Sequence, residues 1–426
     1  MNLRRRSFIK GAAGAAGAYV ISGPAAGAPL ALLSGQDSRF TGLKPMISDV
    51  VPIGDEERRR RIDKARRLMA GAKLDAVIIE GGTSLVYFTG VNWGLSERTF
   101  LWVLPAKGEP GWIAPKFEED RAREQVRFGT DVRTWEEDED PFRLIVQMLD
   151  DRGLRTGRIG LEEKTRFFVF DGLRRAGAGF EYLSADPVTA GSRMIKSPAE
   201  IALMQKAMDI TVAAYRAVFA LIREGMTKSE FGALGQAAHR ALGVTGGLSA
   251  EFGEHSSLPH GSIKPRALRS GDNIQTDGGC GVEGYRSDIS RALAFGKPTD
   301  KYRRLWDLEK KAQEAAFRAA KPDAPCEAVD AAARKVLTDA GLGPDYKVPG
   351  LPHRTGHGIG MDGHEWTYLV RGNKRPMKPG MCFTNEPMII VPGEFGIRLE
   401  DCFYMTEDGA RWFTKPSPSL DQPFVS

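Results

Sequence analysis

Two acid pairs on glycine-rich or apolar hairpins are the residues best suited to bind a cation. Asp277 and Asp288 stand at the two ends of a glycine-rich segment, which we expect to fold as a hairpin about Val282-Glu283. That fold would place the two aspartates opposite each other, where they repel unless a cation or a shared proton lies between them. The alternative is a pair of solvated carboxylates in a surface turn.

A second acid pair has the same design. Glu386 precedes the apolar run Met388–Val391, and the chain turns at Pro392-Gly393 and returns to Glu400. Folding about Gly393 would bring Glu386 and Glu400 together. Acids set in apolar strands are costly to bury without a partner, so this pair also indicates a bound cation.

The histidines point to the same half of the chain. All six lie between His239 and His364, and three of them, His353, His357 and His364, fall in one glycine-rich stretch. Glycines on both sides of His357 allow a close approach of the backbone. A single histidine is more often structural than a ligand, but this grouping favours a site in the second half.

Four carboxylates and one histidine form an oxygen-rich ligand set. Such a set suits Mn²⁺, Co²⁺, Fe²⁺ or Zn²⁺ and does not suit copper or iron–sulfur chemistry. Five side chains exceed what one catalytic ion with an open position needs, so we predict two ions about 3.5–4 Å apart. The predicted ligands are Asp277, Asp288, His357, Glu386 and Glu400.

The first half of the chain alternates between helical and strand-like segments, which is typical of an α/β domain. We place this domain at residues 36–190. Helical patterns fall at 55–70, 117–127 and 141–152, and strand-like runs at 75–80, 85–89, 100–104, 111–114 and 158–161.

The second half, residues 191–426, is predicted to be α+β with the chemistry on its strands. Ser197 and Glu200 form one capping box and Thr227 and Glu230 another, and each box opens a helix. Further helical stretches span 301–320 and 326–340, and strands return after 381.

The first residues read as a secretory signal. Arg4, Arg5 and Arg6 precede Ser-Phe-Ile-Lys10, an apolar run and a cluster of small residues. The paired arginines resemble a twin-arginine (Tat) signal, so residues 1–35 are predicted to be a signal and linker, and the protein periplasmic or secreted. A disordered basic tail is the alternative.

Charge and cysteine content exclude other classes. The formal charge is +5, and removing residues 1–28 leaves +1, which gives no reason to expect a nucleic-acid partner. No stretch of the body is apolar enough for a membrane anchor. The four cysteines form no Cys-x-x-Cys pair, so a structural zinc site is not indicated and buried thiols are expected.

The order Asp, Asp, His, Glu, Glu, with Gly-His-Gly-Ile-Gly, Asn-Glu-Pro and Ile-Arg-Leu-Glu-Asp around the last three, resembles the pita-bread metallopeptidases of family M24. The match runs from Arg193 to the end and fills all five ligand positions. It implies a pita-bread catalytic domain with two divalent ions, with Mn²⁺ expected and Co²⁺, Zn²⁺ or Fe²⁺ as alternatives.

The large first half resembles the N-terminal domain of the prolidase and aminopeptidase P branch. This likeness implies a homodimer that cleaves short peptides between an N-terminal residue and proline. It implies a pocket formed by His260, His353 and His364, in which His260 and His364 donate hydrogen bonds to the substrate and the developing oxyanion. Glu386 is expected as general base and then acid, and Arg398 beside the last ligand. A simple ion pair of Arg398 with Glu400 is an equal alternative. Relatives often carry a tyrosine before the first pocket histidine, whereas residues 246–259 contain none.

Three other functions compete with this reading. They are an inactive binding protein on the same scaffold, a metal-free hydrolase resembling creatinase, and a dimetal hydrolase acting on another bond such as a phosphoester. Because all five ligand types are retained, we disfavour the first two, while the third stays open as a side activity.

Overall fold

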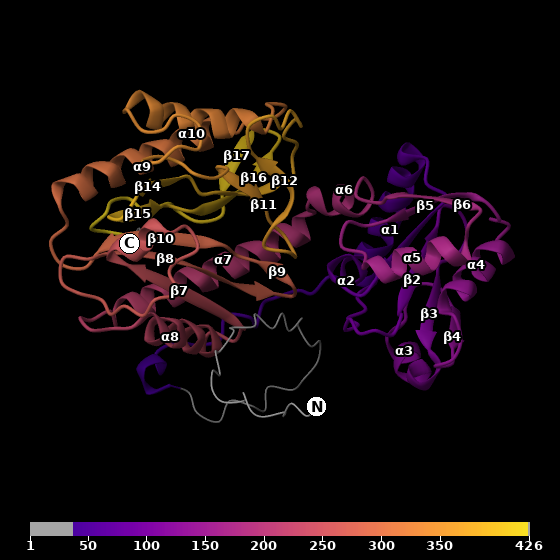
Figure 1. Cartoon of the computed structure of the whole chain (residues 1–426). Coiled ribbons are helices and arrows are strands. Elements are labelled where there is room, and N and C mark those ends of the chain that lie inside the picture. Colours follow the sequence, from indigo (N-terminus) through magenta and orange to yellow (C-terminus); the bar gives the residue numbers. More distant parts are fainter. Residues whose placement is uncertain (1–36, 425–426) are drawn as a thin grey trace, which may run out of the picture.

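The computed structural model describes residues 37–424 and divides the chain into two lobes (Figure 1). The smaller lobe, in indigo and purple, precedes most of the larger one, which runs from magenta to yellow, and the indigo residues before the first helix also pack against the larger lobe. The predicted signal segment lies outside the described residues. No helix among those residues is long and apolar enough to span a membrane.

The smaller lobe is built on one six-stranded sheet with the strand order β4-β3-β2-β1-β5-β6. Successive residues of β1 join two different cores, with Val77 and Ile79 on one face and Ala76 and Ile78 on the other. A central strand covered on both faces has to be apolar throughout, as the run Ala-Val-Ile-Ile is. The strands are β1 (Ala76–Glu80), β2 (Leu101–Pro105), β3 (Gly111–Pro115), β4 (Asp131–Trp135), β5 (Gly157–Leu161) and β6 (Phe180–Ser184).

The helices of this lobe confirm three predictions and correct one. Helices α1, α3 and α4 fall where the sequence pattern places them, but the strand predicted at 85–89 is wrong, because these residues form helix α2. Gly82 (φ 139°) precedes α2 and Gly90 (φ 76°) caps it. The helices are α1 (Asp55–Ala72), α2 (Thr83–Thr89), α3 (Glu119–Gln125), α4 (Pro141–Asp151), α5 (Phe167–Ala176) and α6 (Thr189–Met194), with the 3₁₀ turn η2 (Lys116–Glu118).

The larger lobe opens with the two helices that the capping boxes predict. Ser197 and Glu200 cap α7 (Pro198–Phe219) reciprocally, and Thr227 and Glu230 do the same for α8 (Lys228–Ala241). Helix α7 packs on β8 and α8 on β7, and the two helices share one apolar core with these strands. The predicted later helices are α9 (Asp300–Ala319) and α10 (Glu327–Asp339).

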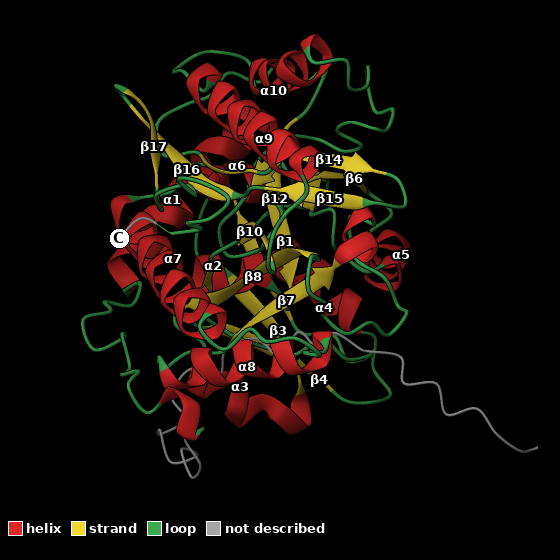
Figure 2. Ribbon diagram, turned by 90° about the vertical axis from the view of Figure 1, so that its left-hand side faces the viewer, coloured by secondary structure: helices red, strands yellow, loops and turns green. Residues whose placement is uncertain are grey.

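The strands of the larger lobe lie between α9 and α10 on one side and α8 on the other (Figures 1 and 2). They form one sheet in the order β10-β8-β7, one in the order β12-β11-β13-β16-β17, and the hairpin β14-β15. Their bounds are β7 (Gly246–Phe252), β8 (Asn273–Val282), β9 (Tyr285–Arg286), β10 (Ile289–Ala294), β11 (Gly356–Gly358), β12 (Glu365–Leu369), β13 (Cys382–Asn385), β14 (Met388–Val391), β15 (Phe395–Arg398), β16 (Asp401–Thr406) and β17 (Gly409–Trp412).

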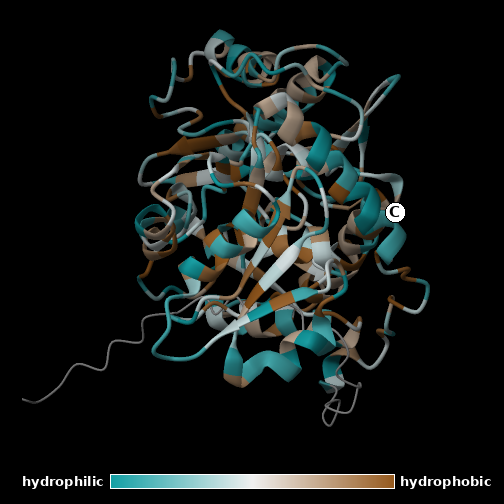
Figure 3. Ribbon diagram, turned by 90° about the vertical axis from the view of Figure 1, so that its right-hand side faces the viewer, coloured by the Kyte–Doolittle hydropathy of each residue, from teal (hydrophilic) through white to brown (hydrophobic). Residues whose placement is uncertain are grey.

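Two apolar cores hold this lobe around the strands. Figure 3 shows teal and brown residues along the same helices, as expected where one face is buried and the other meets water. All four cysteines are buried and free, in agreement with the expectation of unpaired thiols.

Buried ionic contacts fasten the two lobes together. Arg61 of α1 donates to the Tyr285 hydroxyl at 2.9 Å and pairs with Glu200 of α7 at 3.5 Å. Arg193 pairs with Asp362 and Glu365 on the far side of the junction. The smaller lobe therefore contacts the loop between β11 and β12 directly, and that loop carries His364.

Candidate metal centre

The first acid pair lies on the hairpin formed by β8, β9 and β10. Its turn is Glu283-Gly284, both at positive φ, rather than the predicted Val282-Glu283. Asp277 therefore pairs with Ser290 and not with Asp288. Because the slip is two residues and side chains alternate between faces, Asp277 and Asp288 still share one face.

The second acid pair has the register that the sequence predicts. Met388 pairs with Arg398 and Val391 with Phe395, so the hairpin turns about Gly393 at φ 74°. Glu386 and Glu400 lie just beyond the open end of these strands. Both glutamates are buried.

His357 lies on β11, between two glycines that have no room for a side chain. A Cβ on Gly356 would collide with the Thr384 carbonyl oxygen, and one on Gly358 would lie 2.7 Å from the Glu365 carbonyl oxygen. His357 Nδ1 is 3.1 Å from the Gly358 carbonyl oxygen, which can only accept. Nδ1 therefore carries a hydrogen, and Nε2 lies 3.1 Å from Glu386 Oε1.

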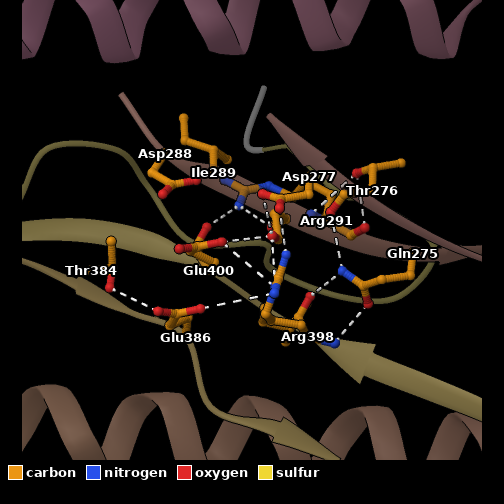
Figure 4. Close-up of polar contacts among 12 residues, drawn as sticks. Gln275, Thr276, Asp277, Asp288, Ile289, Arg291, Thr384, Glu386, Arg398 and Glu400 are labelled. Atoms are coloured by element: carbon orange, nitrogen blue, oxygen red, sulfur yellow. Dashed lines mark hydrogen bonds and ion pairs between the residues drawn. The ribbon is translucent and has the colours of Figure 1, made fainter. Parts of the chain in front are cut away.

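The structure brings all five predicted ligands together. Three groups have donor atoms within 4.8 Å of one another. Figure 4 shows the four carboxylates converging from β8, the start of β10 and both sides of the β14–β15 hairpin. The groups are Asp277, Asp288 and Glu400; His357, Glu386 and Glu400; and Asp288, His357 and His364.

Electrostatics show that this cluster needs positive charge. Burial, then the charge of Asp277, raises the pKa of Asp288 to about 8. Burial and the charge of Asp288 also raise the pKa of Glu400 well above its usual range. Burial opposes the charged form of Glu386 too, but the hydrogen bond from His357 lowers its pKa to about 2 overall. Divalent cations among these oxygens would remove the repulsion, so the residues fit the metal that the ligand set predicts.

Arg398 already supplies one positive charge to the cluster. Its Nη2 lies 2.7 Å from Asp277 Oδ2 and its Nε lies 3.7 Å from Glu400 Oε2. The same Nε donates to Ser290 Oγ at 3.0 Å, and Ser290 Oγ donates to Glu400 at 2.6 Å. Figure 4 shows Arg398 among three of the acids, so it does more than pair with Glu400.

Sequence reasoning missed a layer of residues behind the acids. Arg291 is buried, pairs with Asp401 at 2.8 Å and donates to the Glu400 carbonyl oxygen. Thr384 Oγ1 donates to Glu386 and accepts from the His357 amide. A charged residue inside the apolar strand Ile289–Ala294 was the available signal for Arg291.

The three predicted pocket histidines are placed unequally. His364 stacks on His357 with ring centroids 3.7 Å apart. His353 is partly buried, and burial lowers the pKa of its ring although the charge of Glu386 acts in the opposite direction. His260 is exposed after η3 (Gly253–Ser257), and no hydrogen bond, ion pair or ring contact within residues 37–424 joins it to the others.

The chain resembles known proteins over most of its length. The sequence model of metallopeptidase family M24 matches residues 202–407, and that of the creatinase/prolidase N-terminal domain matches residues 61–195. An uncharacterised peptidase of Schizosaccharomyces pombe is 38% identical over 385 residues, and the alignment covers 84% of this chain and 81% of that peptidase. The chain belongs to metallopeptidase family M24. It is a metal-dependent peptidase with a pita-bread catalytic domain behind a creatinase/prolidase N-terminal domain.

Two further relatives place this metallopeptidase near dipeptidases. An Xaa-Pro dipeptidase of Lactobacillus delbrueckii subsp. lactis is 30% identical, and the alignment covers 84% of this chain and 98% of that dipeptidase. The crystal structure of dipeptidase PepE from Mycobacterium ulcerans superimposes with a TM-score of 0.80 at 31% identity, covering 88% of this chain and 100% of that one. The fold prediction is therefore confirmed.

Proposed function

We propose that this peptidase uses two divalent metal ions to cleave the bond between an N-terminal residue and proline. The proposal rests mainly on how the five ligand residues converge from two hairpins and β11. Within each group of three, their donor atoms lie within 4.8 Å of one another. Two ions spread over overlapping groups account for five ligands better than one ion does. The proposed ligands are Asp277, Asp288, His357, Glu386 and Glu400.

When bound, two such ions lower the pKa of water and polarise a carbonyl group. Glu386 would carry the proton from the attacking water to the leaving nitrogen, first as base and then as acid. His364 would donate a hydrogen bond to the substrate oxygen, where charge develops. His260 and His353 would complete the substrate pocket, and Arg398 would hold Asp277 and Glu400 in place.

The substrate class rests on relatives. The similar proteins of Lactobacillus and Pyrococcus furiosus are named Xaa-Pro dipeptidases. We therefore propose dipeptides with proline in second position as the preferred substrates, and Mn²⁺ as the physiological metal. A homodimer is also proposed from the family resemblance.

Substitution of the proton carrier tests the proposal. Glu386→Gln keeps the size of the side chain but removes its basicity, so we expect kcat for Gly-Pro hydrolysis to fall about 10³-fold or more. The matched control is Glu394→Gln at the exposed tip of the same hairpin, where Glu394 pairs with Lys301. Its activity should stay within about twofold of wild type. Wild-type activity in Glu386→Gln would refute the assignment.

We also propose that residues 1–35 direct export through the twin-arginine pathway to the periplasm or outside. The support is the sequence of this segment alone, in which Arg5 and Arg6 precede Ser-Phe-Ile-Lys. A reporter fused to residues 1–35 that stays inside the cell regardless of these arginines would argue against it.

A further inference from the structure

Arg354 lies between two of the pocket histidines and contacts both. Its backbone carbonyl oxygen is 2.7 Å from Nδ1 of His353, the preceding residue. Its guanidinium Nη2 is 3.0 Å from Nδ1 of His364. One residue thus offers an acceptor to the first ring and a donor to the second.

These contacts fix the position of the proton on His353. A carbonyl oxygen can only accept, so Nδ1 of His353 carries the hydrogen and Nε2 has a free lone pair. That Nε2 is buried and has no hydrogen-bond partner among the described residues. Burial lowers the pKa of His353, which agrees with an uncharged ring. His353 therefore presents an acceptor to whatever enters the pocket.

His364 has the opposite arrangement. A guanidinium can only donate, so Nδ1 of His364 accepts from Arg354 and the ring proton is on Nε2. Donor atoms of His364, His357 and Asp288 lie within 4.8 Å of one another, so His364 is placed where it could compete as a metal ligand. With one nitrogen occupied by Arg354 and the other protonated, it has no lone pair for a cation and stays a hydrogen-bond donor.

We propose that Arg354 is a positioning residue that holds His353 and His364 in opposite tautomers, the first as an acceptor and the second as a donor at Nε2. The use of this pair rests on the proposed function, because a peptide offers both N–H and C=O groups to such a pocket. Arg354 is itself held over the ring of Tyr368 at 4.1 Å, and Tyr368 is the cross-strand partner of His357.

The direct test is nitrogen NMR of the full chain labelled with ¹⁵N-histidine and loaded with Zn²⁺. His353→Gln and His364→Gln variants assign the two signals. We expect a proton on Nδ1 in His353 and on Nε2 in His364. Arg354→Met should change the tautomer of His364 alone, because His353 uses the main-chain carbonyl oxygen.

The matched control is Arg371→Met, which removes a half-exposed arginine that pairs with Asp345 and should alter neither ring. Arg354→Lys keeps a charged donor and should restore the wild-type tautomer of His364. An unchanged His364 signal in Arg354→Met, or a proton on Nδ1 of His364 in the wild type, would overturn the proposal.

Kinetics separate positioning from substrate binding. Arg354→Met should lower kcat for Gly-Pro about 10- to 100-fold with KM changed less than threefold, because it weakens one donor to the developing charge. Arg354→Lys should recover most of kcat. If the wild type cleaves no Xaa-Pro bond while the tautomers follow the pattern above, the proposed function fails and the role of Arg354 stands.

Discussion

At the scale of single residues, the centre depends on backbone positions that exclude side chains. Gly356 lets β11 lie directly against the Thr384 carbonyl oxygen of β13, and this contact brings His357 beside Glu386. The glycines around His357 were visible in the sequence as a sign of close approach. What they approach was not visible, because Thr384 is far along the chain.

Gly356→Ala should therefore destabilise the protein and loosen the centre. Its Cβ would collide with main-chain atoms that cannot rotate away, so we expect a loss on the order of 3 kcal/mol in the free energy of unfolding. Gly247→Ala on β7, where no atom lies within 4 Å of the new Cβ, is the control and should stay within about 0.5 kcal/mol. Denaturant unfolding measures both, and equal stability of the two variants would contradict the close-packing argument.

At the scale of elements, local turn chemistry decided which predictions succeeded. Pro392-Gly393 marks one turn without ambiguity, and the β14–β15 register is as predicted. The first hairpin has three glycines before its tip (278, 279 and 281) and Gly284 within it, so the turn was misplaced by one residue and the pairing by two. Asp277 and Asp288 still lie on one face of the sheet, as predicted, because the pairing differs from the predicted one by an even number of residues.

Helix α2 shows where residue preference misleads. Val86-Tyr-Phe-Thr89 consists of residues that favour strands, yet Gly82 and Gly90 delimit a helix of seven residues. Leu85, Tyr87 and Phe88 are all buried, since the helix packs into the core of the smaller lobe. Burial on every side removes the polar–apolar period that distinguishes a helix from a strand.

At the scale of the whole molecule, the junction between the lobes supports the loop that carries His364. Thr83 and Lys164 of the smaller lobe donate to Asp362 at 2.6 Å and 2.7 Å. Arg193 joins Asp362 to Glu365. Sequence patterns predicted both lobes. They could not predict the contacts between the lobes, because the partners lie far apart in the sequence.

Arg193→Met should weaken this junction in a pH-dependent way. Burial alone would raise the pKa values of Asp362 and Glu365, but Arg193 and neighbouring lysines hold both below their usual ranges. Their stabilising effect is thus present above pH 4–5, near the ordinary carboxyl pKa values, and is lost as pH falls. Removing Arg193 from these acids should lower the free energy of unfolding by about 3 kcal/mol at pH 7.

Thermal unfolding between pH 7 and pH 3 measures this effect. The difference in Tm between wild type and Arg193→Met should be largest at pH 7 and should narrow below pH 4. Arg175→Met, at an exposed ion pair with Asp171, should show little difference at any pH. A difference in Tm that does not change with pH would contradict the charge argument and show that Arg193 acts through packing.

Metal-restored peptide cleavage tests the proposed dimetal peptidase most directly. Protein stripped by a chelator would be assayed on a Gly-Pro dipeptide and an Xaa-Pro-Xaa tripeptide before and after Mn²⁺ is added, with bound metal counted per chain. We expect no activity without metal, recovery at about two ions per chain, and faster cleavage of the dipeptide. Failure of Mn²⁺, Co²⁺ and Zn²⁺ to restore cleavage of either peptide would contradict the proposal.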